Sequence, residues 1–173
     1  GKAKIMATYV EQLILKSNGN RVTYHEITDQ VREIVKKSGI KTGICVVSSQ
    51  HTTCSVFLEE YSHDRNFCGD EYLQVDLNNG LEKIFPRCLS EGQYYHPGPE
   101  HTRFGLEDCD KSTVPDLRSL LNTEAHLKGT LIGYSQTYIV DEGKLSIGSL
   151  GYIYFADWDQ NRERDRKCKV LVM

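Results

Sequence analysis

Three of the six histidines lie in settings where an imidazole could take part in chemistry. His51 follows a short apolar run and is flanked by hydroxyl residues, His96 lies in a glycine- and proline-rich segment, and His126 lies in a segment with helical periodicity. Neutral imidazoles are good zinc ligands, and three protein ligands with one open position are typical of a catalytic zinc site. Because the three are far apart in sequence, separate hydrogen-bonded structural histidines stay open as the alternative.

Carboxylates and a thiol are further candidates. Glu60 and Asp76 could serve as general bases or as an additional metal ligand, although the ordinary place of a carboxylate is the solvated surface. Cys54 follows His51 by three residues, and in an extended strand the two side chains would point to opposite faces, so we predict a core thiol and no Cys/His pair. The chain has neither a GxxxxGK[ST] nor a GxGxxG motif, which argues against an ATP-dependent kinase.

Composition predicts one globular domain over residues 1–173, because this length can bury a sizeable core. No apolar run approaches the roughly 18 residues of a membrane span, and the first residues resemble no secretory signal, so we expect a cytoplasmic protein without a membrane partner.

The net charge of −3 argues against nucleic acid as a partner. The only basic run, residues 162–169, is interpreted as a solvated strand edge. Six cysteines without a CxxC pair predict reduced, mostly buried thiols.

Hydrophobic periodicity and turn residues predict the elements that would position these groups. The strands at each side of Asn18-Gly19-Asn20 should form a first hairpin, Thr28 should cap the first helix and Gly39 should end it. Residues 87–113 should be a long loop. Strands interrupted by about three helices, with hairpins in place of strict alternation, predict an α+β fold with mostly antiparallel sheets. The expected strands cover residues 8–16, 21–24, 43–47, 134–140, 145–155 and 169–172, and the expected helices cover residues 28–38, 70–85 and 115–131.

Several short motifs, in this order along the chain, resemble the YjbQ family, also called the secondary thiamine-phosphate synthase family. The resemblance covers about residues 8 to 172. It rests on Ser49-Gln50-His51-Thr52-Thr53, Glu60, Asp76 before Leu77, Tyr95-His96, the Asn122–Leu127 motif (NTEAHL), Leu131-Ile132-Gly133 and the Gly143–Gly148 motif (GKLSIG).

This resemblance implies a compact trimer whose pocket holds His51, His96 and His126 around a divalent metal, with Zn²⁺ expected and Mg²⁺ possible beside a pyrophosphate substrate. Glu60 and Asp76 match acidic positions of the family and would orient an imidazole or a water. The implied reaction condenses a pyrimidine pyrophosphate with a thiazole phosphate to give thiamine phosphate, a transferase reaction on a small phosphorylated metabolite. The residues expected to bind the phosphorylated groups are Ser49, Thr52, Thr53 and Lys128.

The chain departs from the family where the usual Gly-Thr-Trp-Gln is replaced by Gly148-Ser149-Leu150-Gly151, which removes an indole and an amide. A second interpretation is therefore a metal- or small-ligand-binding homotrimer without catalytic turnover. The remaining histidines, His25, His63 and His101, match nothing in the family and are expected to have no part in the site.

Overall fold

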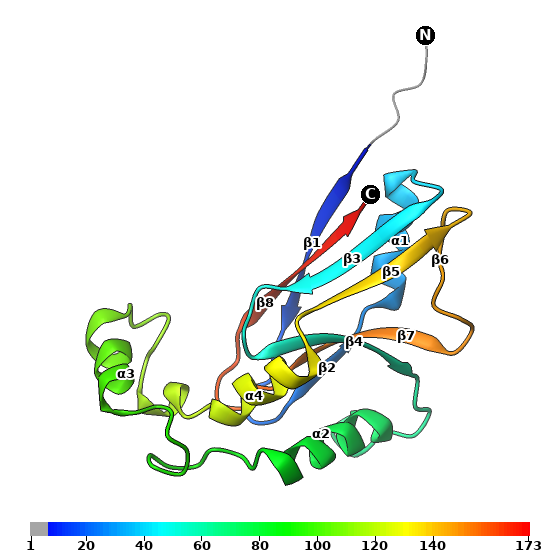
Figure 1. Cartoon of the computed structure of the whole chain (residues 1–173). Coiled ribbons are helices and arrows are strands. Elements are labelled where there is room, and N and C mark those ends of the chain that lie inside the picture. Colours follow the sequence, from blue (N-terminus) through cyan, green and yellow to red (C-terminus); the bar gives the residue numbers. More distant parts are fainter. Residues whose placement is uncertain (1–6) are drawn as a thin grey trace.

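The computed structural model describes residues 7–173, which form two antiparallel sheets and four α-helices (Figure 1). One sheet has five strands in the order β1-β8-β3-β5-β6, and the other has three in the order β2-β7-β4. This arrangement confirms the predicted α+β class. The strands are β1 (Tyr9–Lys16), β2 (Thr23–Glu26), β3 (Gly43–Ser49), β4 (Cys54–Glu60), β5 (Ser135–Asp141), β6 (Lys144–Leu145), β7 (Gly151–Asp157) and β8 (Asp165–Val172); the helices are α1 (Thr28–Ser38), α2 (Tyr72–Ile84), α3 (Pro99–Arg103) and α4 (Thr123–Ile132).

The predicted first hairpin is wrong. Strand β1 pairs with β8, from Tyr9 opposite Val172 to Lys16 opposite Asp165, whereas β2 pairs with β7. The segment between β1 and β2 carries the chain from one sheet to the other, and the backbone of Asn18 donates to Thr23 Oγ1 at 2.6 Å. Strand β8 offers β1 eight residues with regularly alternating burial, which is a longer partner than the four residues of β2.

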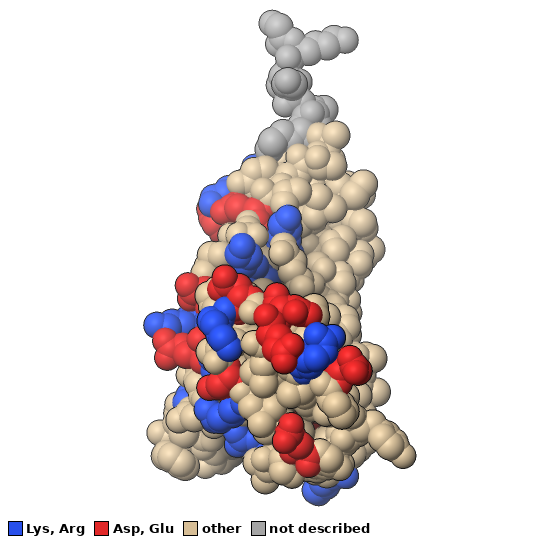
Figure 2. Space-filling model, turned by 90° about the vertical axis from the view of Figure 1, so that its left-hand side faces the viewer, with Lys and Arg blue, Asp and Glu red and all other residues tan. Residues whose placement is uncertain are grey.

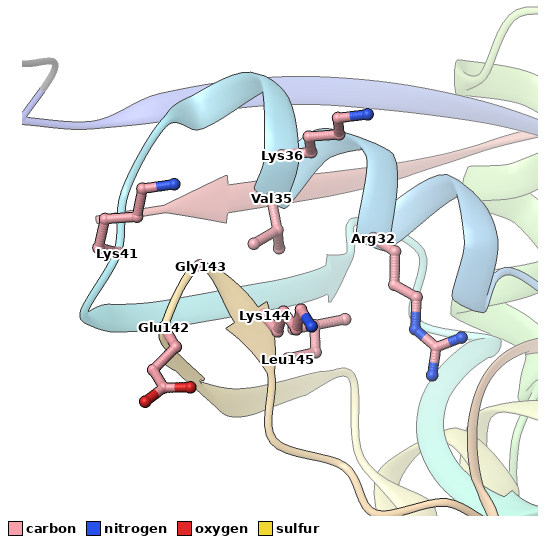
Figure 3. Close-up of a pocket in the computed structure, with 8 residues that line it drawn as sticks. All are labelled: Arg32, Val35, Lys36, Lys41, Glu142, Gly143, Lys144 and Leu145. Carbon is pink, nitrogen blue, oxygen red and sulfur yellow. The ribbon is translucent and has the colours of Figure 1, made fainter.

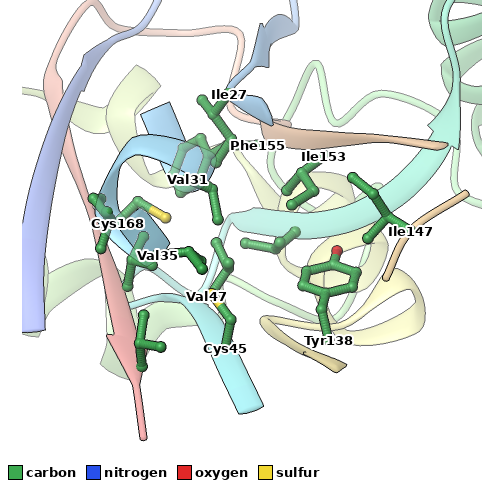
Figure 4. Packing of buried hydrophobic residues seen from close by; sticks show 14 of the residues in the cluster. Ile27, Val31, Val35, Cys45, Val47, Tyr138, Ile147, Ile153, Phe155 and Cys168 are labelled. Carbon is green, nitrogen blue, oxygen red and sulfur yellow. The ribbon is translucent and has the colours of Figure 1, made fainter. Parts of the chain in front are cut away.

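Helix α1 covers the inner face of the five-stranded sheet and the three-stranded sheet closes the same core (Figure 4). The apolar residues of α1 recur at helical spacing and are buried. Gly39 ends this helix in the left-handed conformation with φ of 69°, as predicted. Thr28 does not cap the helix. Its hydroxyl accepts a hydrogen bond from the backbone of Ile153 at 2.9 Å and so fixes α1 to β7. The core side chains are those of Ile27, Val31, Ile34, Val35, Cys45, Val47, Ile153, Phe155, Val170 and Val172, among others.

The middle of the chain is more broken than expected. The segment 87–113 contains α3 and a π-helical turn at Phe104–Asp108, and the helix predicted from residue 115 is divided into a 3₁₀ turn at Leu117–Leu120 and α4. The carboxylate of Asp116 accepts from Ser119 N at 3.0 Å and caps the beginning of the 3₁₀ turn, and Leu121 and Asn122 separate this turn from α4. The strand predicted over 145–155 is also divided, at Gly148 with φ of 73°.

Only Cys168 and Lys169 of the basic run have a strand on each side, because β8 pairs with β1 along its whole length but with β3 only from Cys168 onward. Arg166 in this strand is only 5% exposed. On the face in Figure 2, acidic and basic side chains are interspersed without a large area of one sign. No helix among residues 7–173 is long and apolar enough to cross a membrane. The expectation about a secretory signal concerns mainly residues 1–6, outside the described part.

Throughout the described chain the cysteines are free, as predicted. Cys45, Cys54, Cys88 and Cys168 are buried, and burial raises the pKa of the Cys45 and Cys168 thiols to about 12. Cys54 is fully buried, and burial raises the pKa of its thiol well above the ordinary value, which agrees with a core thiol. Only Cys68 is exposed.

Candidate functional site

The turn between β3 and β4 presents His51. Ser49 closes this turn, because its hydroxyl accepts from the backbone N–H of His51 at 2.9 Å and donates to the carbonyl of His51 at 3.1 Å. The backbone of Cys54 donates to the same carbonyl at 3.1 Å as β4 begins. Ser49, predicted to bind a phosphoryl group, is thus engaged in shaping the turn.

The His51 ring lies between two donors. Its Nε2 is 2.9 Å from the backbone N–H of Lys167, and its Nδ1 is 3.3 Å from Nη1 of Arg166. A neutral imidazole carries one proton, so one ring nitrogen faces a donor while it is itself protonated. The shorter contact to Lys167 favours Nε2 as the acceptor, which leaves the proton on Nδ1, facing Arg166. Burial, followed by the charge of Arg166, lowers the pKa of His51.

The buried carboxylate of Asp157 fixes the position of the Arg166 guanidinium. Its Nε donates to Asp157 Oδ2 at 2.7 Å, and its Nη2 donates to Thr53 Oγ1 at 3.0 Å. Asp157 is fully buried at the end of β7, and its other oxygen accepts from Asp159 N at 3.0 Å. Burial opposes the charge of Arg166, but Asp157 outweighs it and raises the guanidinium pKa. The guanidinium is therefore a fixed cation at the wall of the site.

A second arginine is fixed in the same way. Arg164 Nη2 donates to Asp159 Oδ2 at 2.6 Å, and Asn122 Nδ2 donates to that oxygen at 2.9 Å. Burial alone would raise the pKa of Asp159, but Arg164 and the hydrogen bonds of Asn122 and Asn161 lower it. Asp159 thus ties the beginning of α4 to the segment before β8 as a charged group.

His126 completes this wall from α4. Its Nδ1 is 3.1 Å from Thr52 Oγ1, and burial, followed by the neighbouring His96, lowers the pKa of His126. The resulting cavity, here called the His51 pocket, has a volume of about 250 Å³. It contains two arginines and no carboxylate among its lining residues, which are Gln50, His51, Thr52, Thr53, Asn122, His126, Arg164 and Arg166.

His96 lies in a different cavity, of about 350 Å³, on the other side of His126. Its ring centroid is 6.2 Å from that of His126 and 4.4 Å from that of His101, a residue that was predicted to have no part in the site. Thr123, the first residue of α4, anchors the loop that contains His96, because its hydroxyl donates to the carbonyl of His96 at 2.6 Å. Burial and the proximity of His101 lower the pKa of His96.

The predicted three-histidine metal set is therefore divided between two cavities that share His126. Among residues 7–173, no three His, Cys, Asp or Glu side chains are arranged to hold a metal ion. Both ring nitrogens of His51 already have partners in the protein. The residues in this arrangement do not fit a zinc ion held by His51, His96 and His126, and we derive no chemical step from a metal.

The predicted acidic residues lie elsewhere. Glu60 and Asp76 line a common cavity at the far end of β4 from His51. A strand of this length spans about 20 Å, so neither carboxylate can orient the His51 ring.

Lys128 is fully buried between α4 and α2, where its Nζ donates to Asn78 Oδ1 at 2.7 Å and Glu82 Oε1 at 3.0 Å. Its role in the structure is to join two helices, and it does not face the His51 pocket.

The two arginines of the site, Arg164 and Arg166, were not among the site residues predicted from the sequence. Arg162, Arg164 and Arg166 alternate with other residues, and this period of two places side chains on one face of an extended chain. The aspartates that anchor two of them, Asp157 and Asp159, show the same alternation. Read together, these two patterns would have indicated paired charges on one face and not a solvated edge.

The fold and the pocket define a small α+β protein with a polar cavity lined by fixed cations and imidazoles. The profile of the family described as "UPF0047 protein YjbQ-like" matches residues 11–173. The chain belongs to this family.

Curated relatives support the assignment. A UPF0047 protein of Archaeoglobus fulgidus is 30% identical over 160 residues, which cover 92% of this chain and 99% of the relative. A UPF0047 protein of Methanothermobacter thermautotrophicus is 28% identical over 167 residues, covering 96% and 93% of the two chains.

Solved structures share the fold. A YbjQ-like protein of unknown function from Sulfolobus solfataricus has a TM-score of 0.67 at 26% identity, with 95% of this chain and 96% of that chain covered. An uncharacterised YjbQ/UPF0047 protein from Clostridium acetobutylicum has a TM-score of 0.68 at 27% identity, with 94% and 99% covered.

Proposed function

We propose that the chain binds a small phosphorylated metabolite in the His51 pocket. The observation that carries this proposal is the pair of nitrogens formed by His51 Nδ1 and Arg166 Nη1, 3.3 Å apart. With Nε2 accepting from Lys167, both nitrogens are donors, and an acceptor oxygen placed beside the pair could accept a hydrogen bond from each of them. A phosphoryl oxygen supplies such an acceptor, and an arginine fork suits phosphate geometry.

The neighbouring groups fit the same ligand. Arg164 adds a second cation, and the neutral amides of Gln50 and Asn122 line the cavity. The anchoring aspartates Asp157 and Asp159 keep both guanidinium groups in place before the ligand arrives, which reduces the entropy that binding would cost.

Within this proposal, the reaction is the condensation that the family resemblance implies. The thiazole nitrogen of the thiazole phosphate forms a bond to the methylene carbon of the pyrimidine pyrophosphate, the C–O bond of that carbon breaks, and inorganic pyrophosphate is released. Arg164 and Arg166 would stabilise the charge on the departing pyrophosphate, as fixed cations do in phosphoryl chemistry. His51 Nδ1 would donate a hydrogen bond to it. The alternative is a binding protein that holds the same ligand without turnover.

Binding of inorganic pyrophosphate, measured by calorimetry and thermal shift with and without Mg²⁺, tests the proposal. A native-state ligand at 100 times its Kd stabilises by about 2.7 kcal/mol, which is a clear rise in Tm. His51→Gln and Arg164→Gln should weaken binding by about tenfold or more, while His25→Gln, whose ring contacts the Lys16 carbonyl outside the pocket, should not. Equal binding by all three variants, or none by the parent chain, contradicts the proposal.

Turnover separates the enzyme from the binding protein. Formation of thiamine phosphate from the two substrates that is lost in His51→Gln supports the transferase, whereas tight pyrophosphate binding without product supports the binding protein. Elemental analysis of the purified chain tests the predicted Zn²⁺ directly, and the dependence of binding on added Mg²⁺ tests the second predicted cation.

We also propose assembly into a homotrimer through the sheet face that α1 leaves uncovered. Apolar side chains from four neighbouring strands gather on that face, and several are half exposed or more, such as Ile139 at 56%. Light scattering should give three times 19.7 kDa, and a monomer at micromolar concentration would contradict this proposal. The side chains are those of Val10, Ile44, Val46, Ile139, Leu171 and Met173.

A further inference from the structure

A basic cavity of about 540 Å³ lies between α1, the loop that leads from it to β3, and the hairpin of β5 and β6 (Figure 3). Its volume is within the range of cavities that bind small organic molecules. It is here called the α1 pocket, and its lining residues are Arg32, Val35, Lys36, Lys41, Glu142, Gly143, Lys144 and Leu145.

The charge of this pocket departs from that of the whole chain. The chain carries 24 carboxylates and 21 lysines and arginines, yet four cations and a single carboxylate line the α1 pocket. Among residues 7–173, Arg32 alone of the four forms an ion pair, with Asp29 at the long distance of 3.9 Å. In Figure 3 the carboxylate of Glu142 points away from the middle of the pocket, and so does the amino group of Lys36. The positive charges are thus left without internal compensation.

Three separate elements position the cations. Arg32 and Lys36 are one helical turn apart on α1 and therefore share a face. The carbonyl of Lys41 accepts from Gly143 N at 2.9 Å, which ties the loop to the hairpin, and Lys144 begins β6.

The hairpin turn itself is unusual, because Glu142 has a positive φ of 50°. For a residue with a long side chain this backbone conformation is costly, and such conformations are found more often at functional sites.

We propose that the α1 pocket binds an organic phosphate of nucleotide size. The four cations suit a group with two or more negative charges, and Arg32 and the lysines offer donors for phosphoryl oxygens. Between them, Val35 and the partly buried Leu145 form an apolar floor (Figure 3). This floor fits a flat apolar group joined to the phosphates, as in a nucleoside diphosphate, better than it fits an inorganic anion.

The α1 pocket is distinct from the His51 pocket. The β5–β6 hairpin lies next to the first residue of β3, since Gly43 pairs with Val140, whereas His51 follows the last residue of β3. The seven residues of this strand separate the two sites by about 20 Å. Helix α1 also lies on the opposite side of the sheet from the face proposed for trimer assembly, so the pocket stays open in that assembly.

Calorimetric titration of the full chain with adenosine diphosphate, in low-salt buffer without divalent cations, tests this proposal. Lys144→Gln should weaken binding by about tenfold, the effect of losing one charge-assisted contact, and Lys41→Gln should act similarly. Glu142→Gln should strengthen binding. Lys37→Gln is the matched control, because Lys37 lies on α1 beside Lys36 but pairs with Glu11 at 3.4 Å and does not line the pocket.

Several outcomes decide the matter. Binding that falls in Lys144→Gln and Lys41→Gln, persists in Lys37→Gln and persists in Arg164→Gln of the His51 pocket supports the proposal. The absence of binding, or equal effects of Lys37→Gln and Lys144→Gln, overturns it. Inorganic pyrophosphate that binds the α1 pocket as tightly as adenosine diphosphate also overturns it, because the apolar floor would then contribute nothing. The side chains changed in the α1 pocket and in its control Lys37→Gln are exposed, so unaltered circular dichroism is expected for these variants and checks that each is folded.

Discussion

Replacing Arg166 by Met should strongly destabilise the chain. Asp157 is fully buried and Arg166 is 5% exposed, so the substitution leaves a buried carboxylate whose one remaining hydrogen bond is from the backbone of Asp159. Breaking a buried ion pair from one side costs about 3–5 kcal/mol. With a urea m-value of about 2 kcal/mol per M, the unfolding midpoint should fall by about 1.5–2.5 M.

The control pair has nearly the same geometry but a different environment. Lys16 and Glu163 are 2.8 Å apart, against 2.7 Å for Arg166 and Asp157, and their side chains are 69% and 58% exposed. Lys16→Met should therefore leave the midpoint unchanged within error, because water screens an exposed pair. The double variant Arg166→Met with Asp157→Leu should regain most of the loss. A single-variant loss below about 1 kcal/mol, or a double variant less stable than Arg166→Met, would refute the assignment of the cost to an unpaired buried charge.

Three further outcomes are expected. The lowered pKa values of His51 and His126 mean that the unfolded chain binds protons more readily than the folded chain, so the free energy of unfolding should fall as the pH drops below about 7. The slope of the urea midpoint against pH should therefore flatten in His51→Gln and His126→Gln, and an unchanged slope in both variants would contradict this. A thiol reagent should modify Cys68 rapidly and Cys109 more slowly in the native chain, and all six thiols in denaturant; fast reaction of a buried thiol would show an opening that the structure lacks. Glu142→Asn should raise stability by about 1 kcal/mol in thermal unfolding, since Asn tolerates positive φ, and a lowered Tm would show that Glu142 has an unrecognised stabilising contact.

Local signals in the sequence predicted the local structure well. The glycine at position 39 ended α1 where it was expected to, because positive φ is a requirement of the helix end itself. The apolar run from Gly43 predicted strand β3, which ends just before His51. The motifs around His51 and His126 identified the family. These features depend on a few consecutive residues, which a sequence shows directly.

The pairing of distant segments was not predictable in the same way. Whether β1 pairs with β2 or with β8 depends on which partner buries more surface, and the two candidates are separated by about 140 positions. The position of β8 in turn decides that Arg166 points into the protein, and Lys128 of α4 is buried where it donates to Asn78 and Glu82 of α2. A charged side chain is ordinarily exposed, so only the buried carboxylates reveal that Arg166 is an exception.

The place of β8 between β1 and β3 in the five-stranded sheet has a consequence for synthesis on the ribosome. Strands β1 and β3 do not pair with each other; β8 is the sheet partner of β1, whereas β3 pairs with both β8 and β5. Until residues 165–172 emerge, β1 has no sheet partner, although it was made about 150 residues earlier. Pairing of such distant segments is slow because a long loop must close first. The nascent chain therefore exposes the apolar side chains of an unpaired β1 until β8 emerges, and the His51 pocket, whose arginines lie on or next to β8, cannot form before then.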